Sequence, residues 1–264
     1  MTAALPFGVA LSAGGVIGLV LGLIGGGSIL AVPLLVHAVG IDSPHVAIGT
    51  AAFAVAVNAA AGLGLHARRT KVRWPCALVF SVAGIGGAFA GAAAGKVMDG
   101  QKLLAIFGLL MVVVGVMMLR PRRLSAHPSP WLSRDTARRL LPRLALLGAG
   151  IGMLSGFFGI GGGFLIVPGL MLAADMDLKE ATGASLIAVL AFGLSSATSY
   201  AWSGLVDWPT AALLIAGGAA GSVAGTRLNA VLSQRRVLMT RVFATFVIAA
   251  GVYVSARGAL DLLA

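Results

Sequence analysis

Long apolar stretches alternate along the chain with short stretches that contain glycine, proline and charged residues. Eight apolar segments can be delimited, at residues 8–39, 44–66, 75–95, 103–119, 144–174, 181–204, 209–226 and 237–256. Because about 20 helical residues span the hydrocarbon core of a bilayer, six of these segments each predict one crossing helix. The first and the fifth are too long for one crossing and are interrupted by glycines.

The composition supports a lipid environment for these helices. Hydrophobic residues make up 59% of the 264 residues and charged residues only 10%, and the mean hydropathy is +1.01. A soluble domain carries roughly a quarter charged residues, so this chain has too few to cover a water-exposed surface. We therefore predict an all-α polytopic protein of the cell (inner) membrane. The net charge of +11 comes largely from basic loops, so nucleic acid is not expected as a partner.

The chain contains an internal duplication. The sequence IGGGSILAVP at residues 24–33 matches GIGGGFLIVP at 159–168, with the two prolines 135 residues apart. Val-Arg-Trp-Pro at 72–75 matches Val-Asp-Trp-Pro at 206–209, at an offset of 134. Such sustained matching is typical of two copies of one structural unit.

We therefore divide the chain into a first transmembrane repeat at residues 1–119, a linker at 120–143 and a second transmembrane repeat at 144–264. The linker contains prolines, polar residues and seven arginines, which is typical of a basic cytoplasmic loop. A short amphipathic helix is expected within it, around 133–141. Each repeat then holds four apolar segments.

Two membrane arrangements fit these segments. If every segment crosses once, the two repeats have the same orientation. If the first segment of each repeat instead enters and returns on the same side, each repeat has three crossings and the second repeat is inverted. With the linker inside, the first arrangement places 12 of the 19 Lys and Arg in the cytoplasm and the second places 16 there. Cytoplasmic loops are enriched in Lys and Arg, so the charges favour inverted repeats.

The glycine runs in the two long segments predict a substrate site. Irregular backbone persists in hydrocarbon only where protein or a water-filled cavity surrounds it. Interrupted segments at equivalent positions of two repeats are the best sequence indication of a transporter's binding site. A helix that restarts after a break presents free N–H groups and partial positive charge, which suit an oxyanion. The predicted residues of this site are Gly25, Gly26, Gly27, Ser28, Pro33, Gly159, Gly161, Gly162, Gly163 and Pro168.

Polar side chains in the second segment of each repeat are further candidates. Thr50 and Asn58 lie in one of these segments, and Ser185 and Ser195 lie in the other. Their hydroxyl and amide groups can donate hydrogen bonds to an anion. The same groups can instead bond to a neighbouring helix or to a preceding carbonyl of their own helix, and both interpretations stay open.

These motifs resemble the TauE/SafE family, also called the sulfite exporter or toluene sulfonate uptake permease family. The resemblance rests on the doubled glycine-run-and-proline motif, the Gly-Thr or Gly-Ala-Ser that follows it, and Val-x-Trp-Pro before the third segment. It covers nearly the whole chain apart from the linker. It implies an integral membrane transporter of sulfite, sulfonates or other organic anions. Ser28 departs from the motif, because it replaces the last glycine when the prolines are aligned.

Together these observations predict a membrane transporter for a small anion such as sulfite, a sulfonate or another sulfur-containing organic anion. An anion leaving a negative cell interior gains about 2.3 kcal/mol per charge per 100 mV. Because the predicted spans contain no Asp or Glu for cation coupling, export is favoured. Ion-coupled uptake of organic anions and a non-transporting membrane assembly factor are the alternatives.

No enzyme activity is predicted. The second repeat contains no histidine to activate a serine, and no His-Glu-x-x-His zinc motif occurs. No cofactor or metal is therefore expected. The expected partners are the anionic substrate and the lipid bilayer, and a homo-oligomer stays open.

Overall fold

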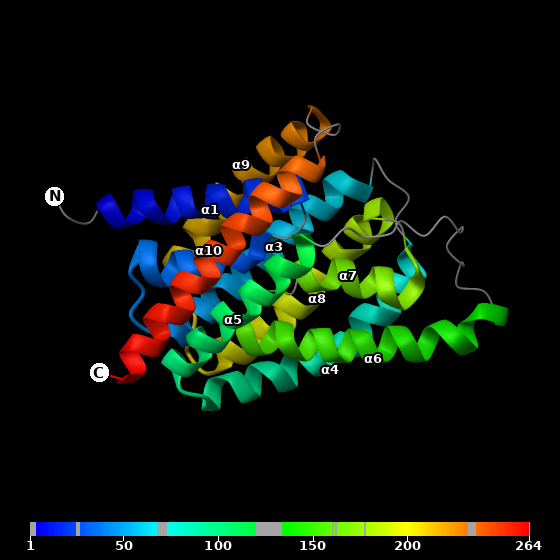
Figure 1. Ribbon diagram of the computed structural model, residues 1–264, viewed down its shortest axis with the longest axis horizontal. Helices are drawn as coiled ribbons and strands as arrows, with labels where there is room; N and C mark the ends of the chain where they lie inside the picture. Colours follow the sequence, from blue (N-terminus) through cyan, green and yellow to red (C-terminus); the bar gives the residue numbers. More distant parts are fainter. Residues whose placement is uncertain are drawn as a thin grey trace.

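The computed structural model of the protein describes residues 4–24, 27–67, 73–119, 134–159, 161, 163–176, 178–231 and 236–263. All regular structure in these residues is helical (Figure 1). The elements are α1 (Ala4–Ile24), the 3₁₀-helix η1 (Gly27–Leu30), α2 (Ala31–Leu34), the π-helix η2 (Leu35–Val39), α3 (Pro44–Ala67), α4 (Trp74–Val97), α5 (Gly100–Leu119), α6 (Arg134–Phe158), α7 (Gly163–Ala174), α8 (Leu178–Trp202), α9 (Trp208–Val231) and α10 (Arg236–Leu263). The helices begin and end close to the boundaries of the predicted apolar segments.

Helix α6 begins earlier than the predicted start of the second repeat. It runs without interruption from Arg134 to Phe158, so the helix expected around 133–141 is the first part of α6 and not a separate linker helix. Leu140 and Leu144 are four residues apart and both are buried. This spacing extends the buried face of the helix by one turn into the charged stretch.

The long first segment of the second repeat folds into a helical hairpin. After α6 ends at Phe158, Gly159 and Gly161 both have a φ of +62°, a conformation that glycine adopts without steric cost. α7 then runs back along α6, so that a Cβ on Gly169 would overlap Ile151. The chain therefore reverses its direction within this apolar segment.

The first segment of the first repeat is also broken. α1 ends at Ile24, and the short elements η1, α2 and η2 follow from Gly27 to Val39. All three contact α1, so this run also packs back on the helix that precedes it. Gly40 ends the run in a left-handed conformation with a φ of +82°.

Glycines join the two repeats through close helix contacts. α1 packs on α9, where a Cβ on Gly14 would lie only 2.5 Å from the carbonyl oxygen of Leu214. α6 packs in the same way on α4, where a Cβ on Gly148 would lie 2.5 Å from the carbonyl oxygen of Phe80. The first helix of each repeat therefore lies on the helix of the third apolar segment of the other repeat, and small residues let the backbones approach.

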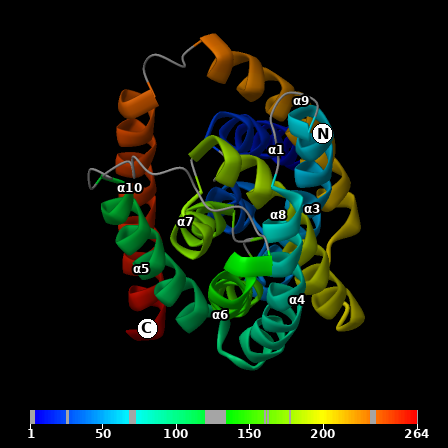
Figure 2. The same ribbon diagram turned by 90° about the vertical axis from the view of Figure 1, so that its right-hand side faces the viewer.

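The directions of the paired helices differ. α3 and α8 are antiparallel, since Gly49 near the start of α3 packs on Tyr200 near the end of α8, and Gly62 lies near Leu186. α5 and α10, side by side in Figure 2, are also antiparallel, with the close pairs Ala105–Gly258, Gly108–Gly251 and Gly115–Ala244. By contrast, α1 runs parallel to α9 and α4 runs parallel to α6.

Six helices in the described part of the chain are long and apolar enough to cross a membrane. They comprise Pro44–Gly64, Trp74–Val97, Gly100–Leu119, Thr136–Phe158, Glu180–Trp202 and Trp208–Leu228. Large apolar side chains on these helices face outward, as Val82 (68% exposed) and Leu146 (75% exposed) illustrate. Trp74, Trp202 and Trp208 are exposed at helix ends, where tryptophan anchors a protein at the membrane surface. These features agree with an all-α polytopic membrane protein.

We predict that Gly152→Ala destabilises the protein and that Gly150→Ala does not. A Cβ on Gly152 would overlap the backbone of Gly84 on α4, whereas a Cβ on Gly150 would meet no atom within 4 Å. An extra methyl group in a packed interface typically costs about 1–3 kcal/mol, and alanine favours a helix over glycine by up to about 1 kcal/mol. Thermal unfolding in detergent measures both variants. Equal unfolding midpoints would contradict the close packing of α4 and α6.

Candidate functional site

The turn between α6 and α7 lies at mid-depth in the helix bundle. A Cβ on Gly161 would lie 3.1 Å from Val55 Cγ1 and 3.3 Å from Val189 Cγ1. Val55 is near the midpoint of α3, and Val189 is near the midpoint of α8. The second glycine break is therefore enclosed by the middle of two long helices, one from each repeat.

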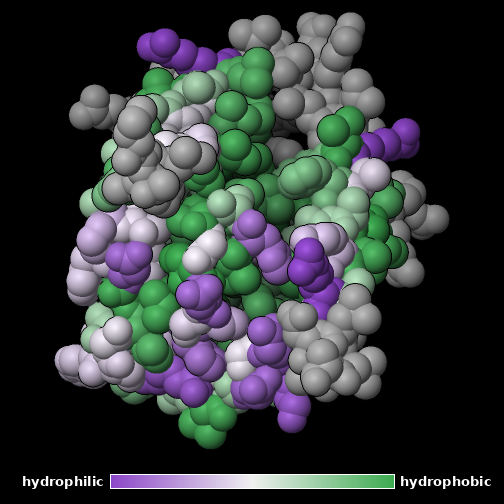
Figure 3. Space-filling view, turned by 90° about the vertical axis from the view of Figure 1, so that its left-hand side faces the viewer, coloured by the Kyte–Doolittle hydropathy of each residue, from purple (hydrophilic) through white to green (hydrophobic). Residues whose placement is uncertain are grey.

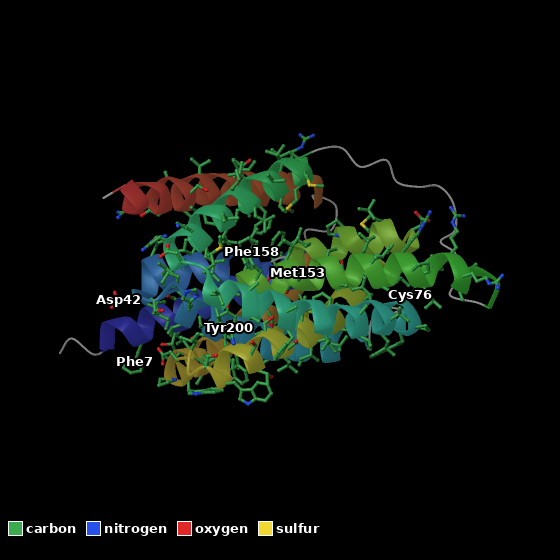
Figure 4. The ribbon with its side chains drawn as sticks, turned by 90° about the horizontal axis from the view of Figure 1, so that it is seen from below. Phe7, Asp42, Cys76, Met153, Phe158 and Tyr200 are labelled. Atoms are coloured by element: carbon green, nitrogen blue, oxygen red, sulfur yellow. The ribbon has the colours of Figure 1, made fainter. Side chains whose placement is uncertain are left out.

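Aromatic rings close one side of this turn. Phe158, the last residue of α6, packs on Phe107 of α5 with ring centroids 5.5 Å apart, and on Phe157 with centroids 4.9 Å apart. Phe107 and Phe158 are both buried. Figure 4 shows Phe158 between the two ends of the molecule, which Asp42 and Cys76 mark. The rings form an apolar wall on this side of the break.

The segments that follow the two breaks contact each other. η1, which begins at Gly27, packs against α7, which begins at Gly163. Ser28 in η1 and Gly163 in α7 are both buried. The structure therefore brings the two predicted halves of the site together. Three further predicted residues lie outside the described residues, and their part in the site stays a prediction: Gly25, Gly26 and Gly162.

Both prolines of the motif lie in the helical segments that follow the two glycine breaks. Pro33 is buried in α2, and Pro168 lies inside α7. Because proline has no N–H, it cannot donate to the carbonyl four residues earlier, which belongs to Ile29 in the first segment and to Phe164 in the second. The N–H groups in the first turn of α7 also have no partner within their helix. Each of the two segments therefore contains backbone polar groups that have no partner within their own helix.

The Ser28 hydroxyl differs from other hydroxyl groups in the helices. Ser185, Ser196 and Ser222 donate to carbonyl oxygens three or four residues earlier, at 2.8–2.9 Å. Ser28 Oγ has no hydrogen-bond partner among the described residues, although its side chain is fully buried. An unpaired buried polar group costs about 1–3 kcal/mol, so its presence needs a reason. A bound ligand that accepts a hydrogen bond from this hydroxyl is such a reason.

Ser155 shares this property and was not predicted from the sequence. Its side chain is fully buried, and in the part of the chain that the structure describes its Oγ has no hydrogen-bond partner. It lies four residues before Gly159 and one turn after Ile151, which contacts Gly169 of α7, so it faces the inside of the hairpin. One feature of the sequence could have indicated this residue. At the offset of 134 the first copy has the apolar Leu21, so the second copy carries a hydroxyl group at a position where the first copy carries none.

Asn58 lies one turn beyond Val55 in α3 and is only 2% exposed. Its Nδ2 donates to the carbonyl oxygen of Leu214 at 3.4 Å, and its Oδ1 has no hydrogen-bond partner within the described ranges. The residue at the equivalent position of α8 is Phe192, which stacks on Phe80 with centroids 5.9 Å apart. A partly satisfied amide in one half of the bundle therefore corresponds to an aromatic pair in the other.

The other three predicted polar residues bond to the protein. Thr50 Oγ1 accepts a hydrogen bond from the backbone N–H of Asp207 at 2.9 Å. Ser185 donates to a carbonyl of its own helix at 2.8 Å, and Ser195 donates to the carbonyl of Ile85 at 3.0 Å. An anion could contact either serine proton only after these bonds break. Their role in binding stays a prediction.

Charged side chains link the repeats at the two ends of the α4–α8 interface. Where both helices begin, Arg73 and Glu180 form an ion pair, with Nε 2.9 Å from Oε2. Where both helices end, the Lys96 ammonium donates to the Ser199 carbonyl at 2.9 Å and to Ser203 Oγ at 3.0 Å. Among the described residues no Asp or Glu is buried, so the centre between these ends lacks buried carboxylates.

Comparison with known proteins identifies the family. The profile of the family described as "Sulfite exporter TauE/SafE" matches residues 10–254, a range that contains both glycine breaks. The chain belongs to the TauE/SafE family. The resemblance predicted from the doubled glycine motif is therefore confirmed.

Relatives of this TauE/SafE protein are named as transporters. A "Probable membrane transporter protein" of Xylella fastidiosa (strain 9a5c) is 46% identical over 257 residues, which is 97% of each chain. The "Probable membrane transporter protein YunE" of Bacillus subtilis (strain 168) is 25% identical over 246 residues, covering 85% of this chain and 90% of the relative. No solved structure matches the chain significantly. The chain is thus a membrane transporter of the TauE/SafE family.

We predict that Ser155→Ala stabilises this TauE/SafE protein in the absence of added anion. The variant removes a buried hydroxyl without a partner, which relieves a cost of about 1–3 kcal/mol. Ser196→Ala is the matched control, because it removes a hydroxyl that donates to the Phe192 carbonyl at 2.8 Å, and we expect no gain from it. Thermal unfolding in detergent measures both. A lower midpoint for Ser155→Ala would show that this hydroxyl is already bonded.

Proposed function

We propose that the protein carries a small anion across the cell membrane, and that the anion is sulfite, a sulfonate or another sulfur-containing organic anion. The contact of η1 with α7 beside the middle of α3 and α8 carries this proposal. Transporters bind their substrates where two interrupted helices of equivalent repeats meet near the midplane. The description of the family as sulfite exporters supports a sulfur oxyanion as the substrate.

The chemistry of the meeting point suits an anion better than a cation. The N-terminal turn of α7 offers N–H groups and partial positive charge. The buried Ser28 hydroxyl can donate one more hydrogen bond, and Ser155 can donate another from the inside of the α6–α7 hairpin. No buried Asp or Glu among the described residues would repel a negative ligand.

We further propose that the two repeats have inverted orientations, with α1–η2 and α6–α7 as re-entrant hairpins. The antiparallel packing of α3 with α8 and of α5 with α10 supports this arrangement. Each of these pairs joins equivalent helices of the two repeats, which would be parallel if both repeats faced the same way. The arrangement also places 16 of the 19 Lys and Arg on the cytoplasmic side.

Alternating access follows when one group of helices moves against the other around the bound anion. The Arg73–Glu180 ion pair and the Lys96–Ser203 hydrogen bond lie at opposite ends of α4 and α8. In the proposed orientation, Arg73 and Glu180 are on the cytoplasmic side and Lys96 is on the outer side. Opening the α4–α8 interface towards one side separates one of these contacts and keeps the other.

Export is the proposed direction. The negative cell interior gives a departing anion about 2.3 kcal/mol per charge per 100 mV, so outward movement needs no coupled ion. Uptake against this potential would need a coupled cation, and a carboxylate in the centre would be the usual proton carrier. The described residues contain no such buried carboxylate.

We predict that Ser28→Ala lowers sulfite flux through proteoliposomes by roughly tenfold or more, since a hydrogen bond to a charged group is worth about 1.5–3 kcal/mol. Ser222→Ala is the matched control, because its hydroxyl already donates to the Ala219 carbonyl at 2.9 Å, and its flux should match the wild type. Equal flux in both variants would remove Ser28 from the site.

The same vesicles test transport itself. Wild-type protein should carry at least one anion from a panel of sulfite, thiosulfate, sulfoacetate, taurine and carboxylates. A complete lack of flux for all of them would overturn the proposed transport and favour a membrane assembly factor.

The proposed inverted repeats predict that both chain termini lie outside the cytoplasm, because α1 begins and α10 ends at the same end of the molecule (Figure 1). Alkaline phosphatase fused to the C-terminus should therefore be active, and a cytoplasmic reporter fused there should be silent. A fusion to the linker at 120–133 should give the opposite result. A cytoplasmic C-terminus would contradict the arrangement.

A further inference from the structure

A cavity of about 200 Å³ opens at the end of the molecule where α10 ends. Its walls come from η2, the segment between η2 and α3, the start of α5 and the last part of α10. Figure 3 looks onto this end, where hydrophilic residues lie among apolar ones. Because the cavity lies at helix ends and the glycine break lies at helix midpoints, the two are separate places in the fold.

Opposite charges line this cavity. Asp42 lies between η2 and α3, and Arg257 lies on α10; both are exposed, and they form no ion pair with each other. The guanidinium of Arg257 lies over the ring of Tyr253, 5.8 Å from its centroid. His37 contacts the same ring edge-on at 5.4 Å. This cation–π contact holds Arg257 on the α10 wall.

The remaining walls limit the size and character of a ligand. Apolar side chains contribute to the lining at Val36, Ile41, Leu104 and Val254, and Gln101 adds an amide. Sites for drug-sized ligands are typically about 300–1,000 Å³, so this smaller cavity suits a molecule with few heavy atoms.

We propose that this cavity binds a small zwitterion, whose acid group pairs with Arg257 and whose amine pairs with Asp42. A simple anion would gain from Arg257 but would be repelled by Asp42, and a simple cation would meet the reverse problem. A ligand that carries both charges satisfies both side chains. The guanidinium also offers paired N–H donors to an acid group.

Two sources supply this chemistry. One is a soluble amino acid or aminosulfonate, and the other is the ethanolamine headgroup of a phospholipid. Both present an acid group and an amine a few bonds apart. The site stands apart from the glycine breaks, so the inference does not rest on the proposed transport.

Calorimetric titration of the full-length protein in nanodiscs of choline phospholipid tests the proposal. The probe is 2-aminoethanesulfonate, and the matched compound is 2-hydroxyethanesulfonate, which keeps the acid group but lacks the amine. We expect the hydroxy compound to bind about fivefold more weakly, the value of one exposed ion pair. Asp42→Asn should remove this preference, and Arg257→Gln should weaken both compounds.

Lys102→Gln is the control, because it removes an exposed cation of α5 that does not line the cavity, and it should bind like the wild type. Equal affinity for the two compounds, or a preference that persists in Asp42→Asn, overturns the zwitterion. No binding of either compound overturns the site.

A second titration tests whether a lipid headgroup occupies the cavity. If nanodiscs of ethanolamine phospholipid suppress binding of the probe, the same charge pair holds a lipid headgroup. Sulfite flux separates this proposal from the transport site. Arg257→Gln should retain flux, whereas Ser28→Ala should lose it, so a failure of either experiment does not decide the other.

Discussion

A peptide group that leaves a helix inside hydrocarbon must be enclosed by protein, because each unpaired N–H or C=O costs several kcal/mol there. The break between α6 and α7 meets this requirement. Gly159 and Gly161 turn the chain at a φ of +62°, and a Cβ on either would contact Ile48 or the pair Val55 and Val189. The middle of α3 and α8 thereby covers the irregular backbone, and a ligand can share that enclosure.

The enclosure depends in turn on how closely the outer helices approach. α1 lies against α9, and α4 lies against α6, with glycines where the backbones touch. Each contact joins one repeat to the other, so neither repeat encloses its break alone. An added methyl group at these positions therefore destabilises the packing of both repeats, and the proposed substrate site depends on glycines far from it.

Much of the fold could be predicted because lipid imposes simple rules on sequence. Helix bounds follow from apolar length, and the two breaks follow from glycine runs that make poor helix. The start of α6 was misplaced because Arg138, Arg139 and Arg143 resemble a loop, although Leu140 and Leu144 continue a buried face. The pattern of charges alone does not reveal that one face of this helix is buried.

The contacts between repeats could not be predicted from the sequence. An offset of 134 shows which residues are equivalent, but it does not show that α1 packs on α9 or that Arg73 meets Glu180. Ser155 was missed because a single serine in an apolar helix usually bonds to its own backbone, and only the structure shows that it does not.

When a transporter consists of two copies of one unit, its two access states have equal energy only if both copies carry the same side chains. Here the copies differ at the equivalent positions Asn58 and Phe192, since the amide of Asn58 bonds to the Leu214 carbonyl and the ring of Phe192 stacks on Phe80. Any motion that exchanges the surroundings of the two copies must trade polar contacts for ring stacking. In the proposed inverted arrangement, the two access states therefore differ in energy before any substrate binds, because the two copies carry different side chains at this position.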